Sequence, residues 1–314
     1  MKNTFFYGNG LNYLSDNPVG WEELLEKVMG DKKFDTNSLP YLMTYERIRL
    51  NWNTAKSKSK NGISHLKVEI ARILDSQKSN EFYEKLLNLP VENYITTNYD
   101  YAINKAFHKH SLKNLSKNNS TEELYSIRRN TSLVNENGES GKVWNIHGEL
   151  DNPKSIMLGI NHYCGSVGKI DGYIKGTYNF TIKGERPEVK SIEEKLKKNE
   201  FDGFSWLELF FNSNVYIAGF GLDFSEIDIW WILNKRARLK ELSLIKNNIT
   251  YYTKPIEQVT KNIEIEKRKR ELLESFGVKL VTIPIIGKDY GNQWNEIYDN
   301  VKKTASTSGN EINC

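Results

Sequence analysis

Short apolar runs rich in aromatic and β-branched residues alternate along this chain with segments whose apolar residues recur at helical spacing. The expected strands are residues 4–7, 93–96, 142–146, 155–158, 214–218, 248–252 and 278–283. The expected helices are residues 21–29, 64–74, 191–198, 227–239, 257–276 and 294–301. Strands that alternate with helices are typical of βαβ units. We therefore predict an α/β fold: a Rossmann-like, doubly wound, mainly parallel sheet with helices on both faces.

Two long stretches interrupt this alternation, at residues 17–89 and 160–211. The first is expected to hold three or four helices and a Lys/Ser-rich loop at residues 56–60, and the second is rich in Gly, Lys and aromatic residues. We interpret both as helical insertions in one domain that spans residues 1–303. Residues 304–314 are small and polar, which is typical of a flexible tail.

Composition excludes several classes of protein. No stretch approaches eighteen consecutive apolar residues, so no membrane span is expected, and the N-terminal apolar run stops at Gly8, too early for a signal peptide. The two cysteines, Cys164 and Cys314, are far apart and cannot form a disulfide framework or a four-cysteine zinc site. These features together predict a protein of the reducing cytoplasm.

Charge does not point to a nucleic-acid partner. The 44 basic and 40 acidic residues are interspersed along the chain, as on an ordinary solvated surface. The densest basic run, Lys267-Arg268-Lys269-Arg270, is flanked by glutamates at helical spacing. This pattern favours an exposed helix with ion pairs over a nucleic-acid patch, which remains the weaker alternative.

Polar and glycine-rich segments follow four of the expected strands. Doubly wound sheets bind ligands beyond the carboxyl ends of their strands, so these segments are expected to meet in one crevice. Gly, Asn, Asp and His there allow close backbone approach to a ligand, hydrogen bonding and proton transfer. The four segments, in chain order, are Gly8-Asn9-Gly10-Leu11-Asn12, Thr97-Asn98-Tyr99-Asp100, His147-Gly148-Glu149 and Gly219-Phe220-Gly221-Leu222-Asp223.

The first segment is a candidate phosphate loop. Glycines after a strand are often only part of a turn, but backbone N–H groups of such a loop and of the next helix can hold a diphosphate. The loop lacks the third glycine of the common dinucleotide fingerprint, and no acidic residue about twenty positions later fits the ribose role. A hydride-transfer dehydrogenase is therefore disfavoured.

The second and third segments carry the candidate catalytic residues. Asn98 or Asp100 alone could simply cap a helix that begins near Tyr101, but a cap needs only one of them. His147 could be an ordinary surface residue in a turn. It follows an apolar run and precedes Gly148, however, which predicts an imidazole that faces the crevice.

In this order, the four segments resemble the motifs of sirtuins. The chain resembles the sirtuin-like NAD-hydrolase domains of bacterial anti-phage defence systems more than the protein deacylases, over about residues 3–235. One departure is Asn9-Gly10-Leu11-Asn12, where many relatives have Ala, Gly, an aromatic or aliphatic residue and Ser; a loop that acts through its backbone tolerates this change. The other is the missing four-cysteine zinc module after the histidine strand, which disfavours deacylation.

Four other residues could in principle bind a metal ion. His108, His110, His162 and Cys164 are potential ligands, but they lack the paired short spacing of structural zinc sites. We expect no metal.

The resemblance implies that NAD is the substrate and is cleaved to nicotinamide and ADP-ribose. It places the diphosphate on Gly8 to Leu11, with Asn12 and Thr97 also in the cofactor site, and the nicotinamide ribose between Asn98 and His147. Asn98 would bond the ribose or a water, Asp100 would orient Asn98 or the carboxamide, and His147 would accept a proton. The turn at Gly219, Phe220, Gly221 and Asp223 would face the adenosine half, and Tyr163 is a further candidate for the pocket.

The resemblance also implies regulation, because an unregulated NAD hydrolase would kill its host. We expect an abortive-infection effector that works as an oligomer and is activated by a separate sensor: an ATPase, an Argonaute-like protein or a nucleotide-binding enzyme. Trp206, Trp230 and Trp231 are candidate interface anchors, although helical spacing favours the core for them. The alternatives are a non-catalytic subunit that binds NAD or ADP-ribose, and a zinc-free deacylase or ADP-ribosyltransferase.

Overall fold

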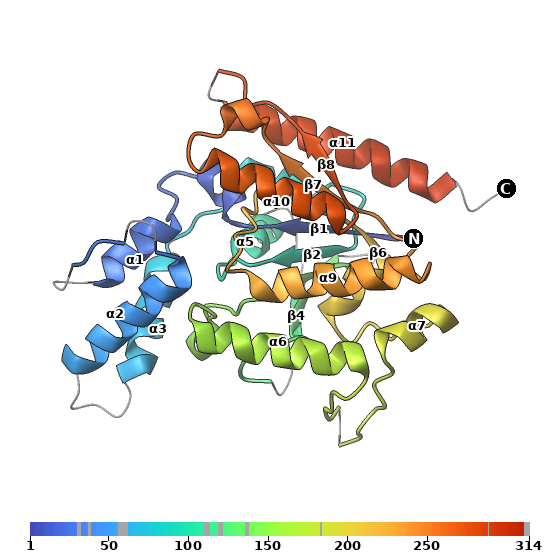
Figure 1. Ribbon diagram of the computed structural model, residues 1–314, viewed down its shortest axis with the longest axis horizontal. Coiled ribbons are helices and arrows are strands. Elements are labelled where there is room, and N and C mark those ends of the chain that lie inside the picture. Colours follow the sequence, from blue (N-terminus) through green and yellow to red (C-terminus); the bar gives the residue numbers. More distant parts are fainter. Residues whose placement is uncertain are drawn as a thin grey trace.

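The structure is a computed structural model that describes residues 1–29, 33–36, 39–55, 62–109, 114–118, 122–135, 138–182, 184–287 and 289–310. Its centre is an eight-stranded sheet in the order β3-β4-β5-β2-β1-β6-β7-β8 (Figure 1). The six strands from β5 to β8 in that order pair in parallel, whereas β3 and β4 form an antiparallel extension next to β5. The predicted doubly wound, mainly parallel α/β fold is confirmed. The strands are β1 (Lys2–Tyr7), β2 (Asn93–Thr96), β3 (Asn114–Asn118), β4 (Asn130–Asn135), β5 (Gly138–Asn145), β6 (Ser213–Ala218), β7 (Ile249–Thr253) and β8 (Val278–Thr282).

Helices cover both faces of the sheet, because alternate residues of the central strands are apolar on opposite sides. In β1, Phe6 packs into a core with α6, α8 and α9, whereas Phe5 and Tyr7 pack on the other side with α4, α5 and α11. The helices of these two layers are α4 (Glu81–Leu87), α5 (Ala102–Lys109), α6 (Ile160–Lys175), α7 (Ile192–Lys198), α8 (Leu209–Asn212), α9 (Ile227–Glu241), α10 (Ile263–Ser275) and α11 (Tyr290–Asn310), with single-turn helices η3 (Trp206–Glu208) and η4 (Ile256–Gln258).

Three helices between β1 and β2 form a separate lobe, seen at the left in Figure 1: α1 (Trp21–Met29), α2 (Tyr41–Ala55) and α3 (Gly62–Leu74). Their apolar faces share a third core with Tyr99, Leu150 and Leu158, which follow the carboxyl ends of β2 and β5. The lobe therefore lies against the edge of the sheet where a ligand crevice is expected. The Lys/Ser-rich loop predicted at residues 56–60 falls outside the described residues.

Two sequence-based expectations differ from the structure. Residues 155–158 form no strand: the chain runs from the turn η2 (Pro153–Ser155) into α6, and Ile156 and Leu158 are apolar because they pack beneath the α1–α3 lobe. The hairpin β3–β4 was missed because its strands are polar.

The C-terminal segment differs as well. Helix α11 continues to Asn310, well into the expected tail, and the buried Ala305 packs against the sheet-side core. The side chains of Thr304 and Ser306 each donate a hydrogen bond to a backbone carbonyl four residues earlier.

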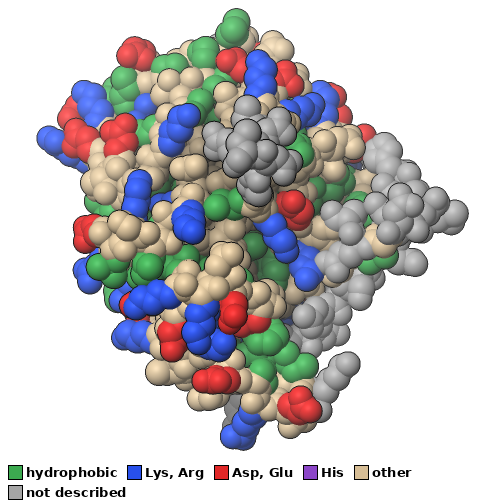
Figure 2. Space-filling view, turned by 90° about the vertical axis from the view of Figure 1, so that its right-hand side faces the viewer, with side chains coloured by type: hydrophobic (Ala, Val, Ile, Leu, Met, Phe, Trp, Pro, Cys, Tyr) green, Lys and Arg blue, Asp and Glu red, His purple; other side chains and the backbone are tan. Residues whose placement is uncertain are grey.

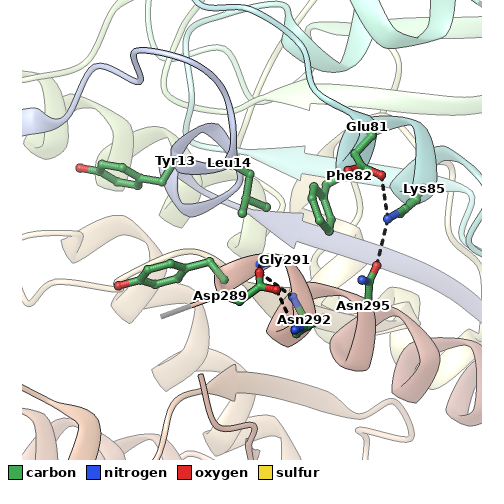
Figure 3. A pocket seen from close by; sticks show the side chains of 10 residues that line it. Tyr13, Leu14, Glu81, Phe82, Lys85, Asp289, Gly291, Asn292 and Asn295 are labelled. Atoms are coloured by element: carbon green, nitrogen blue, oxygen red, sulfur yellow. Dashed lines mark hydrogen bonds and ion pairs between the residues drawn. The ribbon is translucent and has the colours of Figure 1, made fainter. Parts of the chain in front are cut away.

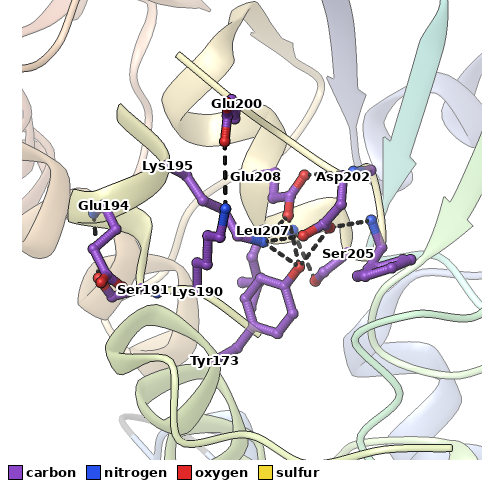
Figure 4. A network of polar contacts seen from close by, with 12 residues as sticks. Tyr173, Lys190, Ser191, Glu194, Lys195, Glu200, Asp202, Ser205, Leu207 and Glu208 are labelled. Carbon is purple, nitrogen blue, oxygen red and sulfur yellow. Dashed lines mark hydrogen bonds and ion pairs between the residues drawn. The ribbon is translucent and has the colours of Figure 1, made fainter. Parts of the chain in front are cut away.

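The second insertion is held by a buried polar cluster around Lys195 (Figure 4). Its Nζ donates to Asp202 Oδ2 (2.7 Å), Glu208 Oε1 (2.5 Å) and Tyr173 Oη (3.2 Å), which uses all three ammonium donors. The side chains of Lys195 and Glu208 are each 1% exposed. We call these four residues the Lys195 cluster; it joins α6, α7 and η3.

The surface carries side chains of both charges. On the face drawn in Figure 2, Lys and Arg side chains are interspersed with Asp and Glu. In α10 the four predicted basic residues each pair with a glutamate three or four positions away, as expected. Lys267 and Arg268 are exposed, whereas Lys269 is buried and donates to the Gly221 carbonyl. In the part of the chain that the structure describes, no helix combines the length and the apolar character needed to span a membrane.

Trp206 belongs to the core, where it is 2% exposed, and Trp230 and Trp231 pack partly buried against the same core. Core packing is therefore the better interpretation of these three residues.

Candidate active site

The crevice lies at the point where the strand order reverses, between β1 and β6. The turn that starts the helix η1 (Asn9–Leu14) packs directly on the turn after β6, because the Gly10 N–H donates to the Gly219 carbonyl at 2.8 Å. A Cβ on Gly10 would lie 2.6 Å from Gly219 Cα, and Gly219 itself has a φ of +62°. Glycine is thus needed at both positions for the two loops to touch.

Side-chain hydrogen bonds of Asn9 hold the conformation of the candidate phosphate loop. Asn9 donates to the Val19 carbonyl and accepts from Asn12 Nδ2 at 2.9 Å. The Leu11 side chain is fully buried in the sheet-side core, and the Gly10 N–H is engaged by Gly219. The role of this loop in holding a diphosphate stays a prediction, and in this conformation the Gly10 amide would not contribute to it.

Asp100 has the structural role that the cap alternative predicts. Its Oδ1 accepts from the Ala102 N–H at the start of α5 (2.9 Å), and its Oδ2 accepts from Asn12 Nδ2 (2.8 Å). Burial raises the pKa of Asp100, although these two hydrogen bonds oppose the rise. Tyr83 of α4 donates to Asn12 Oδ1, so the network also ties the loop to the helical layer. Asp100 fixes the loop through Asn12 and does not bond Asn98.

Asn98 joins the first two loops. Its Nδ2 donates to the Gly8 carbonyl at 3.3 Å, and its own carbonyl accepts from Asn145 Nδ2 at 2.9 Å. Asn98 is 8% exposed and, together with Asn9 and Thr97, lines a small pocket. The structure therefore places Asn98 and Thr97 at the crevice beside the loop.

His147 belongs to a buried ionisable cluster that sequence analysis did not identify. Its Nε2 donates to Asp228 Oδ2 at 3.0 Å, and its Nδ1 lies 3.7 Å from Glu226 Oε2. Tyr163 donates to the same Glu226 oxygen at 2.8 Å and packs edge-on against the imidazole. Ser166 Oγ lies 3.4 Å from Asp228 Oδ2. We call His147, Glu226, Asp228 and Tyr163 the His147 cluster.

In this cluster the pKa values of His147 and Glu226 are both raised above their ordinary values. Burial alone would lower the pKa of His147, but the charge of Asp228, the hydrogen bond with it and the charge of Glu226 raise it above its ordinary value. Burial raises the pKa of Glu226 to about 7; the charge of His147 opposes the rise and that of Asp228 adds to it. Perturbed pairs of this kind are characteristic of functional sites.

One route of hydrogen bonds connects Asn98 to His147. Tyr99, next to Asn98, donates to the Met157 carbonyl, and the Met157 N–H donates to the His147 carbonyl at 2.8 Å. A Cβ on Gly148 would lie 2.4 Å from the Ser155 carbonyl oxygen, so the turn after His147 packs tightly against the segment before α6. The two candidate catalytic residues thus lie in segments that are fixed to each other.

The crevice is closed in this conformation. The pocket beside Asn98 has a volume of about 30 Å³ and the pocket beside Tyr163 and Glu226 about 20 Å³, whereas ligand pockets are typically 300 to 1,000 Å³. Trp21 of α1 lines both pockets and contacts Tyr41 and Tyr99. The Trp21 side chain therefore separates the Asn98 side of the crevice from the His147 cluster.

The turn after β6 is only partly directed at the crevice. The Phe220 side chain points into the core and packs on Phe6, with ring centroids 4.8 Å apart. Asp223 is exposed and accepts from Ser225, and a Cβ on Gly221 would meet nothing within 4 Å. Of the residues expected to face adenosine, Gly219 lies at the loop contact. The carbonyls of Phe220, Gly221 and Asp223 already accept hydrogen bonds from Tyr251, Lys269 and Trp230, and a ligand role for these three stays a prediction.

A larger pocket, of about 390 Å³, lies away from the crevice between η1, α4 and the start of α11 (Figure 3). Its charged groups are already paired: Lys85 contacts Glu81 and Asn295, and Asp289 accepts from the first N–H groups of α11. Size alone does not make it the functional site, because none of the four motif segments lines it.

Potential metal ligands lie at two places in the structure. His162 Nδ1 accepts from the Leu158 and Gly159 N–H groups, and burial lowers the pKa of His162 to about 3, while Cys164 is exposed and His110 lies outside the described residues. Among the described residues, one group of potential ligands does converge, His147, Glu226 and Asp228. A direct hydrogen bond between His147 and Asp228 already accounts for their geometry.

Glu226 and Asp228 were not among the predicted site residues; they fall at the start of the helix expected at residues 227–239. A usable signal was their place shortly after β6, at the same sheet edge as the other motifs. Their pairing with His147 spans about 80 positions, and no local pattern predicts such a contact.

Comparison with known proteins shows what this chain resembles. Residues 92–235 match the model of the SIR2-like domain family, a range that contains Asn98 and the whole His147 cluster. The chain is 23% identical to "NAD(+) hydrolase ThsA" of Enterococcus faecium over 283 residues, which cover 88% of this chain and 51% of that protein. It is 28% identical to "NAD(+) hydrolase ThsA" of Bacillus cereus (strain MSX-D12) over 171 residues, 54% of this chain and 33% of that protein.

The chain thus spans about half or less of the length of these curated relatives. The matched range begins after the loop at Gly8 and ends within α9. The resemblance inferred from the motifs is confirmed: residues 92–235 are similar to the SIR2-like domain family, and the fold is a Rossmann-like α/β sheet.

Proposed function

We propose that this chain cleaves NAD to nicotinamide and ADP-ribose. The observation that carries the proposal is the His147 cluster, a buried acid–base site fixed to the Asn98 segment at the topological switch point of the sheet. A subunit that only binds a nucleotide needs the loop glycines but not such a cluster. The names of the two relatives, both NAD(+) hydrolases, support the same reaction.

The chemistry of the cleaved bond determines which catalytic groups the protein must supply. The N-glycosidic bond joins ribose to a cationic pyridinium, so nicotinamide leaves as a neutral molecule and needs no general acid. The site must stabilise an oxocarbenium-like transition state and supply a positioned, activated water. Asn98 offers an amide for the ribose hydroxyls or the water, and the carboxylates of the His147 cluster offer negative potential and a proton acceptor.

Activation by another component is part of the proposal. The two closed pockets cannot accommodate NAD, so turnover requires the α1–α3 lobe to move away from the crevice. We infer that the chain is the toxic effector of an anti-phage, abortive-infection system in the cytoplasm. A separate ATPase, Argonaute-like protein or nucleotide-binding enzyme, or assembly of an oligomer, would shift it to the open state.

The test measures cellular NAD after co-expression with the genes adjacent to this one, with and without phage challenge, and nicotinamide release by the purified chain. NAD should fall on challenge, and Asn98→Ala and His147→Ala should each reduce the loss sharply. Unchanged NAD loss in both variants would contradict the proposal.

The rival functions have their own readouts. Calorimetric binding of NAD without nicotinamide release would favour a non-catalytic subunit. Transfer of label from NAD to a protein acceptor would favour a deacylase or an ADP-ribosyltransferase.

A further inference from the structure

The three ionisable groups of the His147 cluster differ in what they can reach. The side chains of His147 and Asp228 are 2% and 1% exposed, whereas that of Glu226 is 15% exposed and lines the pocket that it shares with Trp21 and Tyr163. We propose that Glu226, and not His147, accepts the proton when NAD is cleaved, and that His147 and Asp228 position it. This inference rests on the proposed function.

Both nitrogens of the His147 ring face carboxylates. Nε2 is bonded to Asp228 Oδ2, and Nδ1 is directed at Glu226 from 3.7 Å, so an imidazolium fits this environment and a neutral base does not. His147 also lines neither of the two crevice pockets. To take a proton from water it would have to leave one of its two partners.

Glu226 has an oxygen available for the reaction. Glu226 lies just before α9, in the segment that follows the carboxyl end of β6, and Tyr163 donates a hydrogen bond to its Oε2. Within the described residues no hydrogen bond reaches Oε1. A carboxylate with one oxygen held and the other open can orient a water for attack.

The bond from ribose C1′ to the nicotinamide nitrogen breaks, and its electron pair neutralises the pyridinium. A water oxygen forms the new bond to C1′, and the proton of that water passes to Glu226. The products are nicotinamide and ADP-ribose, and Glu226 returns the proton to solvent when the crevice opens.

The charges around Glu226 suit this role. It faces His147 after β5, Asp228 on α9, Tyr163 on α6 and Asp223 in the turn after β6, with Tyr99 and Tyr41 also close. Together with burial they bring the pKa of Glu226 to about 7, where a base is most effective at neutral pH.

The experiment compares pH profiles of nicotinamide release from NAD. The full-length chain is assayed in its natural form and with Trp21→Ala, which removes the side chain between the two pockets, and each form carries in turn Glu226→Gln, Glu226→Asp or His147→Gln. If Glu226 is the base, kcat/KM of the parent rises with pH through a midpoint near 7. Glu226→Gln then loses about 100-fold or more together with the rising limb, and Glu226→Asp keeps the limb at a reduced rate.

The variant His147→Gln distinguishes Glu226 from His147 as the catalytic base. Because the charge of His147 lowers the pKa of Glu226, its removal should move the limb to higher pH without abolishing it. If His147 were the base, His147→Gln would remove the limb, and Glu226→Gln would keep it and move it to lower pH, since Glu226 raises the pKa of His147. That second pattern overturns the proposal.

Two controls keep the outcomes distinct. Glu208→Gln alters a buried glutamate that also accepts from a tyrosine, Tyr173, far from the crevice, and should leave the pH midpoint unchanged. A stoichiometric divalent metal found on the purified wild type but not on Glu226→Gln would overturn the role as base, because the carboxylate would then be a ligand. Failure of the proposed function looks different: neither parent form, natural or Trp21→Ala, releases nicotinamide, and cellular NAD does not fall when the chain is co-expressed with the adjacent genes and challenged with phage.

Discussion

Two buried polar clusters in this molecule have similar chemistry and different connections. In each, a tyrosine of α6 donates to a buried glutamate: Tyr163 to Glu226 in the His147 cluster, and Tyr173 to Glu208 in the Lys195 cluster. Lys195 uses all its donors within its cluster, and Glu208 Oε2 also accepts from the Gly203 N–H. The Lys195 cluster is complete in itself, whereas the His147 cluster keeps a carboxylate at a pocket.

The difference shows how burial alone fails to identify a functional site. Complete pairing fixes a fold, because any change of protonation would leave a buried charge without a partner. An incomplete cluster at a crevice can exchange a proton with a ligand. We therefore expect the two clusters to respond to mutation in different observables, stability for one and turnover for the other.

The largest effect on stability is expected from Lys195→Met. It leaves the buried Glu208 without its cation, which should lower the free energy of unfolding by about 3–5 kcal/mol. Urea unfolding measures this change, and Lys198→Met, on the exposed side of the same helix, is the matched control. Equal stability of the two variants would show that the Lys195 cluster does not hold the insertion.

For the His147 cluster, the expected effect is a change in how folding stability depends on pH. The pKa of Glu226 is raised to about 7 in the folded chain, so ionisation of this group costs folding stability as the pH rises from about 4.5 to 7. Glu226→Gln removes that cost. The variant should therefore gain stability relative to wild type by about 3 kcal/mol between pH 4.5 and pH 8. A constant difference across this range would place Glu226 in an ordinary solvated setting.

Sequence patterns predicted the fold well, because they report local preferences. The alternation of apolar runs and helical periodicity located β1, β2, β6, β7 and β8, and the rule for strand ends brought the four motif segments to one edge. The run at residues 155–158 was misassigned because apolar residues in a buried loop and in a buried strand look alike.

The site was predicted only in part. Asn98 and His147 were found at strand ends, but the partners that determine the protonation of His147 come from α9, far along the chain. Asp100 met the simpler expectation of a helix cap. Pairings over long sequence separations form only in the folded structure, so the spacing of residues along the chain does not predict them.

Opening the crevice should raise basal turnover. Trp21 makes aromatic contacts with Tyr41 and Tyr99, each worth about 0.5–1.5 kcal/mol. Their loss in Trp21→Ala favours open conformers, so nicotinamide release by the isolated chain should increase by about tenfold. The control is Trp52→Ala, which removes a tryptophan of α2 that lines neither pocket. Turnover that does not change, or falls, in Trp21→Ala would argue against Trp21 as the closing element.

The smallest expected effects separate the two tyrosines. Tyr173→Phe should cost about 1 kcal/mol of stability through its lost hydrogen bond. Tyr163→Phe removes a hydrogen bond that lowers the pKa of Glu226, so its turnover limb should shift to higher pH. Both variants are measured for unfolding and for pH profile, and a shifted limb in Tyr173→Phe would erase the distinction between the clusters.

The most direct test of the central claim is nicotinamide release from NAD by two matched variants, Glu226→Gln and Glu208→Gln, in the chain opened by Trp21→Ala. Each replaces one buried, tyrosine-bonded carboxylate by an amide of the same shape. The account predicts that Glu208→Gln keeps the turnover of the folded protein and that Glu226→Gln loses about 100-fold or more. Equal turnover in the two variants would contradict it.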